Sequence, residues 1–288
     1  MTKTRVLAAL VMGPLAIAAV LFLPTPWMML LAALVVLAGL WEWFKLAGVE
    51  DSLTRSFLMA ANLLLMVMLV WASTTGQGGG TLALFHVMML LGVAWWWIAV
   101  LWLRHHQWSA GNGGLGRAFK LVAGTLAVIP AWCALVVIHG DPSDESLVGP
   151  IARNHLWLLT ALMIVWMADS GAYFTGRKFG RRKLAPTISP NKTVEGLLGG
   201  LVAAVLVGVG FGMLAGAAGT QLGWVALTAL LTAIASVVGD LVESLLKRQA
   251  GVKDSGHVIP GHGGVLDRID SVLAALPVFA LCKASFGF

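Results

Sequence analysis

The chain has 288 residues, of which 59% are hydrophobic and only 11% are charged, and its mean hydropathy is +0.88. Because a soluble globular domain carries about 25% charged residues, this composition excludes a water-soluble protein and indicates one embedded in a membrane. The formal net charge of +6 could suggest a nucleic-acid partner, but the basic residues are distributed as membrane topology requires, and we expect no nucleic-acid binding.

Nine apolar stretches follow one another along the chain, each near the roughly 20 residues that a transmembrane helix needs. They lie near residues 5–23, 27–46, 57–75, 81–103, 119–139, 155–176, 195–216, 221–246 and 267–286. The expected fold is all-α, a polytopic integral membrane protein with about nine transmembrane helices.

The first stretch has the outline of a secretory signal peptide, because Lys3 and Arg5 precede its apolar run. No small-x-small cleavage pattern separates it from the second stretch, which begins after Pro24 and Pro26. We therefore expect the first stretch to be a retained helix.

The basic residues indicate the orientation of the chain. With nine spans, the N-terminus and every loop after an even-numbered helix share one side. All but two of the 19 Lys and Arg residues fall on that side, the exceptions being Arg153 and Lys283. Since loops rich in Lys and Arg remain in the cytoplasm, we expect these loops to face the cytoplasm.

The two halves of the chain differ in where their ionisable residues lie. Residues 1–150 carry few within the apolar stretches and are expected to be transmembrane scaffold helices. The place of Glu42, between two tryptophans, stays open between the membrane interface and the bundle interior. Residues 151–288 carry acidic and basic residues within or beside apolar helices, where such groups are costly and functional by default. They are the predicted catalytic region.

Two acidic helix ends predict a metal site. The eighth stretch ends with side chains that project from one face of a helix, namely Asp240, Glu243, Ser244 and Lys247. The ninth begins with Asp267 and Asp270, whose spacing makes them neighbours on a helix surface. Clusters of carboxylate oxygens suit Mg2+, which is typically held by one or two carboxylates together with substrate phosphates.

A basic loop ending in glycines joins these two helix ends. It contains Lys247, Arg248, Lys253 and, after Pro260, the run Gly261, His262, Gly263 and Gly264. Glycine lets the main chain approach a ligand closely, and successive backbone N–H groups can cradle phosphate. A snorkelling positive-inside loop would explain Lys247 and Arg248, but not the acidic residues at the same helix ends. A site for metal and phosphate is therefore favoured.

The segment reads Ser244-x-x-Lys247-Arg248, four residues, Lys253-Asp254, and later His262-Gly263-Gly264-x-x-Asp267-Arg268-x-Asp270. This run resembles the signature of the phosphatidate cytidylyltransferase family. Similar to the family too are Asp169-Ser170-Gly171-Ala172-Tyr173-Phe174 and Ser189-Pro190-Asn191-Lys192-Thr193-x-Glu195-Gly196. In the second block Thr193 or a neighbour could cap a helix, and contact with lipid headgroups is the alternative for the basic run 177–183. The resemblance covers about residues 166–270, and the N-terminal half matches only in hydropathy.

The resemblance implies that the chain transfers a cytidylyl group from CTP to phosphatidic acid, which yields CDP-diacylglycerol and pyrophosphate. The implied cofactor is Mg2+, the surroundings are membrane lipid, and a homodimer is plausible for the family. The lipid phosphate is the nucleophile, and since the second pKa of a phosphomonoester is about 6, no strong general base is required. Neutralisation of charge and positioning then supply most of the catalysis.

Residue roles follow from charge and place. The expected metal ligands, direct or through water, are Asp240, Asp267 and Asp270, with Asp169 and Glu243 as further contributors. The expected catalytic residues are Lys247, Arg248, Lys253, His262, Arg268 and Asp169. The expected substrate-binding residues are Ser189, Lys192, Ser244, Gly263 and Gly264. Whether Ser189 and Lys192 contact the lipid phosphate or the triphosphate stays open, as does a purely structural role for His262.

Three alternatives remain. A related CTP-dependent enzyme, either a lipid kinase or a cytidylyltransferase for another lipid, would use similar residues. An ion-coupled transporter would need acidic residues at several depths, whereas these concentrate at one set of helix ends, and no inverted repeat is visible. A purely structural membrane protein would need none of them.

Overall fold

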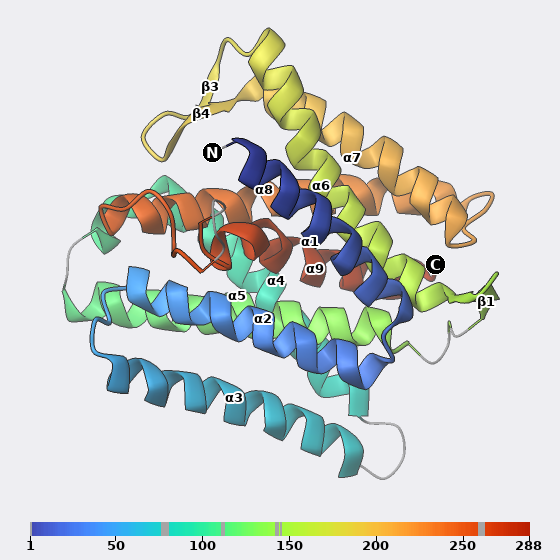
Figure 1. Ribbon diagram of the computed structural model, residues 1–288, viewed down its shortest axis with the longest axis horizontal. Coiled ribbons are helices and arrows are strands. Elements are labelled where there is room, and N and C mark those ends of the chain that lie inside the picture. The colour runs from blue at the N-terminus through green and yellow to red at the C-terminus, as the bar shows by residue number, and fades with distance from the viewer. Residues whose placement is uncertain (1, 76–80, 111–112, 142–143, 145, 259–262) are drawn as a thin grey trace.

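Figure 1 shows the computed structural model, which describes residues 2–75, 81–110, 113–141, 144, 146–258 and 263–288. Its long helices are α1 (Thr2–Phe22), α2 (Thr25–Leu46), α3 (Ser52–Thr75), α4 (Thr81–Arg104), α5 (Gly114–His139), α6 (Arg153–Phe179), α7 (Val194–Leu214), α8 (Gln221–Gln249) and α9 (Leu266–Phe286). Each predicted stretch coincides with one of them to within a few residues. The predicted all-α fold is therefore confirmed.

The remaining elements are short. A 3-10 helix, η1 (His106–Ser109), follows α4, and β1 (Leu147–Val148) pairs with β2 (Ile151–Ala152) in an antiparallel ribbon before α6. A second ribbon pairs β3 (Lys183–Ala185) with β4 (Ser189–Thr193), between α6 and α7. Strands of two to five residues are too short to show a hydrophobic periodicity, so sequence patterns do not predict such ribbons.

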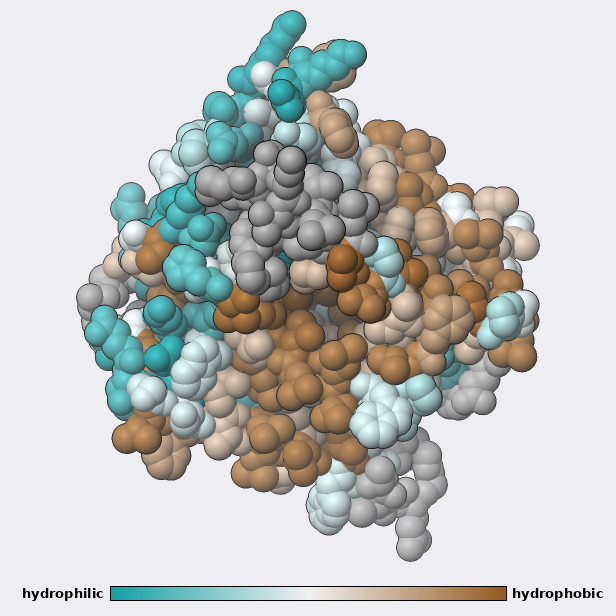
Figure 2. Space-filling view, in the orientation of Figure 1, coloured by the Kyte–Doolittle hydropathy of each residue, from teal (hydrophilic) through white to brown (hydrophobic). Residues whose placement is uncertain are grey.

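The lengths of the helices fit a bilayer. Among the described residues, the eight helices α2 to α9 are long and apolar enough to cross a membrane, and α1 contributes the shorter apolar stretch Val11–Phe22. Large apolar side chains point outward on several helices, among them Phe57, Leu64 and Leu206. Figure 2 shows hydrophobic residues gathered over the middle of the molecule. Such a surface is suited to lipid, and the chain is an integral membrane protein.

Local signals set where helices begin. The α2 helix starts at the sequence Pro24-Thr25-Pro26, since proline is tolerated in a first helical turn. Asp51 precedes α3, and its carboxylate accepts hydrogen bonds from the Thr54 hydroxyl and the Thr54 and Leu53 amides, which lower its pKa. Thr193 Oγ1 accepts a hydrogen bond of 3.1 Å from Gly196 N at the start of α7, which confirms the predicted cap.

Small residues bring α6 and α7 into close contact. A Cβ at Gly171 would lie 2.7 Å from Ala203 Cβ, and one at Gly200 would lie 2.5 Å from the Ala168 carbonyl oxygen. Such distances leave no room for larger side chains. Gly171 of α6 and Gly200 of α7 thus serve helix packing within this chain.

The bundle has two polar ends. At one end the basic residues Arg153 and Lys283 pair with Asp144 and Asp141, at 3.4 Å and 3.1 Å. At the other end the carboxyl ends of α2, α6 and α8 meet the amino ends of α7 and α9. In Figure 1 the β3–β4 ribbon and the loop after α8 lie at the left, and the β1 ribbon lies at the right. Hydrophilic residues gather at the left and upper left of Figure 2, which is the end that carries the predicted site.

Candidate active site

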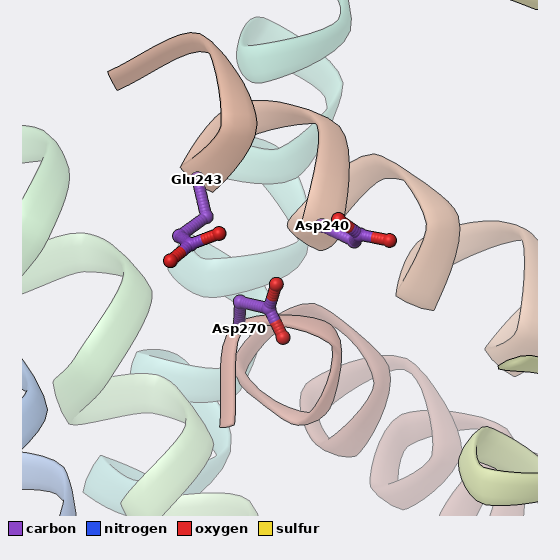
Figure 3. A group of neighbouring side chains, drawn as sticks. All are labelled: Asp240, Glu243 and Asp270. Atoms are coloured by element: carbon purple, nitrogen blue, oxygen red, sulfur yellow. The ribbon is translucent and has the colours of Figure 1, made fainter. Parts of the chain in front are cut away.

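Three carboxylates converge where α8 meets α9. Asp240 and Glu243 lie one turn apart on α8, and Asp270 lies one turn into α9. One oxygen from each side chain lies within 4.8 Å of the others. Figure 3 shows the Asp270 carboxylate between the two acidic side chains of α8. We call these three residues the acidic cluster.

Close packing of the two helices beside the cluster depends on Gly239. A Cβ at this position would overlap the carbonyl oxygen of Asp270 and lie 3.1 Å from Ala274 Cβ. A glycine here lets the α8 backbone approach the first turns of α9. The cluster is therefore positioned by the helix pair itself, which is more rigid than a loop.

Two lysines face the acidic cluster from different elements. Lys247 Nζ lies 2.5 Å from Glu243 Oε2 and 2.6 Å from Asp267 Oδ1. Lys192, on β4, forms an ion pair with Asp240. The short ribbon thus brings a cation to the wall of the site, next to the helix N-terminus that Thr193 caps.

The donor set fits a hard divalent cation. Carboxylate oxygens are the ligands that Mg2+ prefers in proteins. Glu243 is almost completely buried, with 1% of its surface exposed, and its Oε1 accepts no hydrogen bond within the part of the chain that the structure describes. An unpartnered carboxylate oxygen is costly to bury, so a cation held between Asp240, Glu243 and Asp270 would supply the missing partner.

Asp267 lies outside the acidic cluster and organises the loop. Its Oδ2 accepts hydrogen bonds from Ser255 N, Ser255 Oγ and Gly264 N at 2.8 to 2.9 Å, and its Oδ1 accepts one from Lys247. Glu243, expected as a further contributor, belongs to the acidic cluster, whereas Asp267, expected as a ligand, does not. Metal binding by any of these residues stays a prediction. The spacing of residues along each helix does not reveal how the two helices are rotated against one another.

The two predicted phosphate-binding glycines have packing roles in this structure. Gly263 adopts a left-handed conformation, with φ of +83°, and a Cβ there would lie 2.6 Å from Asp267 Oδ2. A Cβ at Gly264 would overlap both Glu42 Oε2 and Ser255 Oγ. Because Gly264 N donates to Asp267, this amide is engaged within the loop. Phosphate binding by these glycines stays a prediction.

Two cavities meet at the cluster. A polar cavity of about 330 Å³ is lined by acidic and basic side chains and two serines, which are Asp169, Asp240, Glu243, Ser244, Lys247, Arg248, Lys253, Asp254, Asp267, Arg268, Asp270 and Ser271. A more apolar cavity of about 470 Å³ lies between α6, α7 and β4, and Lys192, Arg177 and Asn191 are among the residues that line it. Asp169 and Asp240 belong to both linings. These two carboxylates therefore stand where the cavities join.

The other predicted residues divide between the cavities and the scaffold. Ser244 Oγ lies 3.4 Å from Asp240 Oδ1 and lines the polar cavity. Arg248 also lines it, and its Nε donates to Ile188 O at 3.3 Å, which ties the end of α8 to the turn of the β3–β4 ribbon. Ser189 pairs with Ala185 in that ribbon and lies outside both described linings. His262 falls outside the described residues.

One carboxylate of the site comes from the half of the chain that was expected to be scaffold. Glu42, near the end of α2, is 4% exposed and accepts hydrogen bonds from Ser255, Val265 and Leu266. It faces the bundle, so the open choice between interface and interior is decided. The sequence offered one signal for this role, an acidic residue near the end of an apolar helix, but it did not indicate which residues Glu42 would contact.

This arrangement can bind polyanions and hold them in a fixed orientation. The polar cavity offers three carboxylates for a cation and several lysine and arginine side chains for phosphate oxygens. The apolar cavity opens beside it and ends on Lys192. Positioning and charge neutralisation of this kind are the main requirements of phosphoryl-type transfer.

Comparison with known proteins extends the resemblance over the whole chain. The sequence model described as the cytidylyltransferase family matches residues 3–286. The phosphatidate cytidylyltransferase of Pseudomonas aeruginosa is 39% identical over 280 residues, which cover 97% of this chain and 96% of the relative. That of Haemophilus influenzae is 38% identical and covers 97% of this chain and 98% of the relative. The similarity therefore includes the N-terminal half, where the sequence alone gave only hydropathy.

Proposed function

Because the chain belongs to the cytidylyltransferase family, we propose that it transfers the cytidylyl group of CTP to phosphatidic acid. The products are CDP-diacylglycerol, a precursor for phospholipid biosynthesis, and pyrophosphate. The observation that carries this proposal is the junction of a polar and an apolar cavity at a cluster of carboxylates and lysines. A soluble nucleotide and a membrane lipid require such a junction if they are to react.

The reaction makes one bond and breaks one. An oxygen of the lipid phosphate attacks the α-phosphorus of CTP, and the bond from that phosphorus to the oxygen that bridges to the β-phosphate breaks. The leaving group is pyrophosphate. The attacking phosphate is already ionised, so the residues of the site need to neutralise charge and align the two phosphates.

The two cavities suggest where each substrate binds. We assign the triphosphate to the polar cavity, where Lys247, Arg248, Lys253 and Arg268 provide positive charge. The lipid phosphate would enter through the apolar cavity and meet Lys192, which stands beside Asp240 at the junction. This assignment favours the lipid for Lys192, a choice that the sequence left open.

The acidic cluster would hold the cofactor Mg2+ through Asp240, Glu243 and Asp270, with Asp169 close to the same junction. Bound Mg2+ would neutralise phosphate charge and orient the α-phosphate for in-line attack. Asp267, which was expected to be a ligand, would act on Lys247 and the loop. Its place outside the cluster supports this revised role.

We propose that the site faces the cytoplasm in the bacterial inner membrane. The positive-inside rule supports this orientation, since the site lies at the bundle end opposite Arg153 and Lys283, which pair with acidic residues. CTP would then reach the polar cavity from the cytoplasm. A homodimer stays a prediction, as does the division of the chain into scaffold and catalytic halves at about residue 150.

The test is a pyrophosphate-release assay with the purified protein, CTP, phosphatidic acid in detergent micelles, and Mg2+. Release should require all three additions and should be lost in Asp270→Asn. Release of CDP in place of pyrophosphate would identify a lipid kinase, and activity with another phospholipid alone would identify a different substrate. Solute uptake into liposomes without any pyrophosphate release would indicate a transporter and overturn the proposal.

A further inference from the structure

Glu42 connects the N-terminal helices to the active-site loop, and we propose that it is a positioning residue for the acidic cluster and Lys247. The expected effect of Glu42 on the reaction rate rests on the proposed function. Its structural basis is independent, because it depends only on contacts between α2, Ser255 of the loop after α8, and the start of α9.

The Glu42 carboxylate makes three long-range contacts. Its Oε1 accepts a hydrogen bond from Val265 N at 3.1 Å, and its Oε2 accepts bonds from Leu266 N and Ser255 Oγ, both at 2.8 Å. The partners lie more than 200 positions away in sequence. Hydrogen bonds to a carboxylate are roughly twice as strong as those between neutral groups, so these three contacts tie the loop and the start of α9 to α2.

The α9 helix lacks a cap of its own. Val265 precedes it and provides no side-chain hydrogen bond to the first turn. The first amides of a helix have no partner within the helix, and its amino end favours a negative charge. Glu42 therefore supplies from another helix the cap that the local sequence does not contain.

The α2 helix holds Glu42 at a fixed point. The next residue, Trp43, is fully buried and its Nε1 donates to Lys120 O on α5 at 2.8 Å. A Cβ at Gly124 would lie 2.6 Å from Trp43 Cδ1, so the indole lies directly against the α5 backbone. Because α2 is packed against α5 in this way, Glu42 holds the start of α9 at a fixed position relative to these two helices.

Ser255 links this junction to the reacting groups. Its hydroxyl lies 2.8 Å from Glu42 Oε2 and 2.9 Å from Asp267 Oδ2. Asp267 in turn holds Lys247 at 2.6 Å, and Lys247 faces Glu243 of the acidic cluster. Movement of Glu42 would therefore shift the first turn of α9, the ammonium of Lys247 and, one turn later, Asp270.

Glu42→Gln tests this role, because the amide keeps the size of the side chain but replaces one acceptor oxygen by an N–H donor. Either the Val265 amide or the Leu266 amide would then face a donor. Loss of a residue that orients the ligands of a metal typically costs about 10–100-fold in metal affinity or enzymatic activity. We expect kcat to fall by that factor and the Mg2+ concentration for half-maximal activity to rise, while KM for phosphatidic acid stays within about twofold of the wild type.

Glu50→Gln is the matched control, since Glu50 carries the same side chain just beyond α2 and is exposed. It should leave kcat and the Mg2+ dependence unchanged. Ser255→Ala is the second variant, for it removes the bridging hydroxyl and leaves every backbone contact in place. In the Glu42→Gln background it should have less effect than alone, because the two substitutions break one network.

Hydrogen exchange of the full-length protein gives a readout that does not depend on activity. In Glu42→Gln the amides of residues 264–270 should exchange faster, while those in the middle of α5 and α8 exchange as in the wild type. A wild-type kcat, or unchanged exchange at 264–270, would overturn the inference, as would faster exchange throughout the bundle. If the wild type itself forms no CDP-diacylglycerol but the local exchange result holds, the proposed function fails and the positioning contact stands.

Discussion

Replacement of Gly239 by alanine should separate the two helices that carry the acidic cluster. The added Cβ would overlap the carbonyl oxygen of Asp270 and lie 3.1 Å from Ala274 Cβ. Carbon atoms in good contact are about 3.5–4.0 Å apart. The start of α9 must therefore move away from α8 by roughly half an ångström or more, and Asp270 moves with it, away from Asp240 and Glu243.

The expected loss follows from that displacement. A misplacement of about 1 Å can cost 100-fold in rate, so a shift of half that size or more should lower kcat by about tenfold or more. Overpacking of a helix contact costs about 1–3 kcal/mol of stability, which a folded variant can tolerate. The assay is CDP-diacylglycerol formation at saturating CTP across a Mg2+ titration, with thermal unfolding in detergent measured on the same samples.

Gly223→Ala provides the matched control on the same helix. No atom lies within 4 Å of a Cβ at Gly223, and alanine is favoured over glycine in a helix by up to about 1 kcal/mol. This variant should keep full activity and equal or greater stability. A folded Gly239→Ala protein with the kcat and Mg2+ dependence of the wild type would refute the reasoning, since the cluster would then tolerate separation of its helices.

Asp240→Asn should reduce turnover by more than about 100-fold and leave thermal stability unchanged. Loss of a direct metal ligand should cost more than loss of a residue that only orients the ligands, which costs about 10–100-fold. Asp267→Asn should reduce both turnover and stability, the latter by about 1–3 kcal/mol, because contacts to Lys247 and Ser255 weaken. Equal effects of the two substitutions on unfolding temperature would contradict these separate roles. Lys192→Met should raise KM for phosphatidic acid about tenfold or more and leave KM for CTP unchanged, and the reverse pattern would move Lys192 to the triphosphate. EDTA should abolish activity and added Mg2+ should restore it, whereas activity that survives chelation would remove the metal from the mechanism.

The helices and the location of the site could be predicted from the sequence. Each helix is marked by an apolar stretch long enough for a bilayer. Because a short loop joins consecutive spans, the end of α8 and the start of α9 must lie on the same side of the bundle. Asp240 lies about two and a half turns before the end of α8, and Asp270 lies about one turn after the start of α9. Both therefore belong to the acidic cluster where these two helix ends meet.

The remaining features depend on how helices rotate and on contacts between distant segments. Glu243 and Asp267 both lie at the right helix ends, but only the rotation of α8 against α9 decides which one faces the other carboxylates. Glu42 accepts hydrogen bonds from amides more than 200 residues away, and the residues next to it in the sequence do not indicate these partners. Gly264 looks like a phosphate-binding glycine in a linear motif, yet its lack of a side chain makes room for Glu42 and Ser255.

The fate of the CTP phosphates tests the proposed reaction most directly. The purified protein is incubated with phosphatidic acid, Mg2+ and CTP that carries a radioactive label on either the α- or the γ-phosphate, and the lipid and aqueous products are then separated. Cytidylyl transfer predicts that the α-label enters the lipid and the γ-label leaves as pyrophosphate. A γ-label in the lipid, or no labelled lipid from either nucleotide, would contradict it.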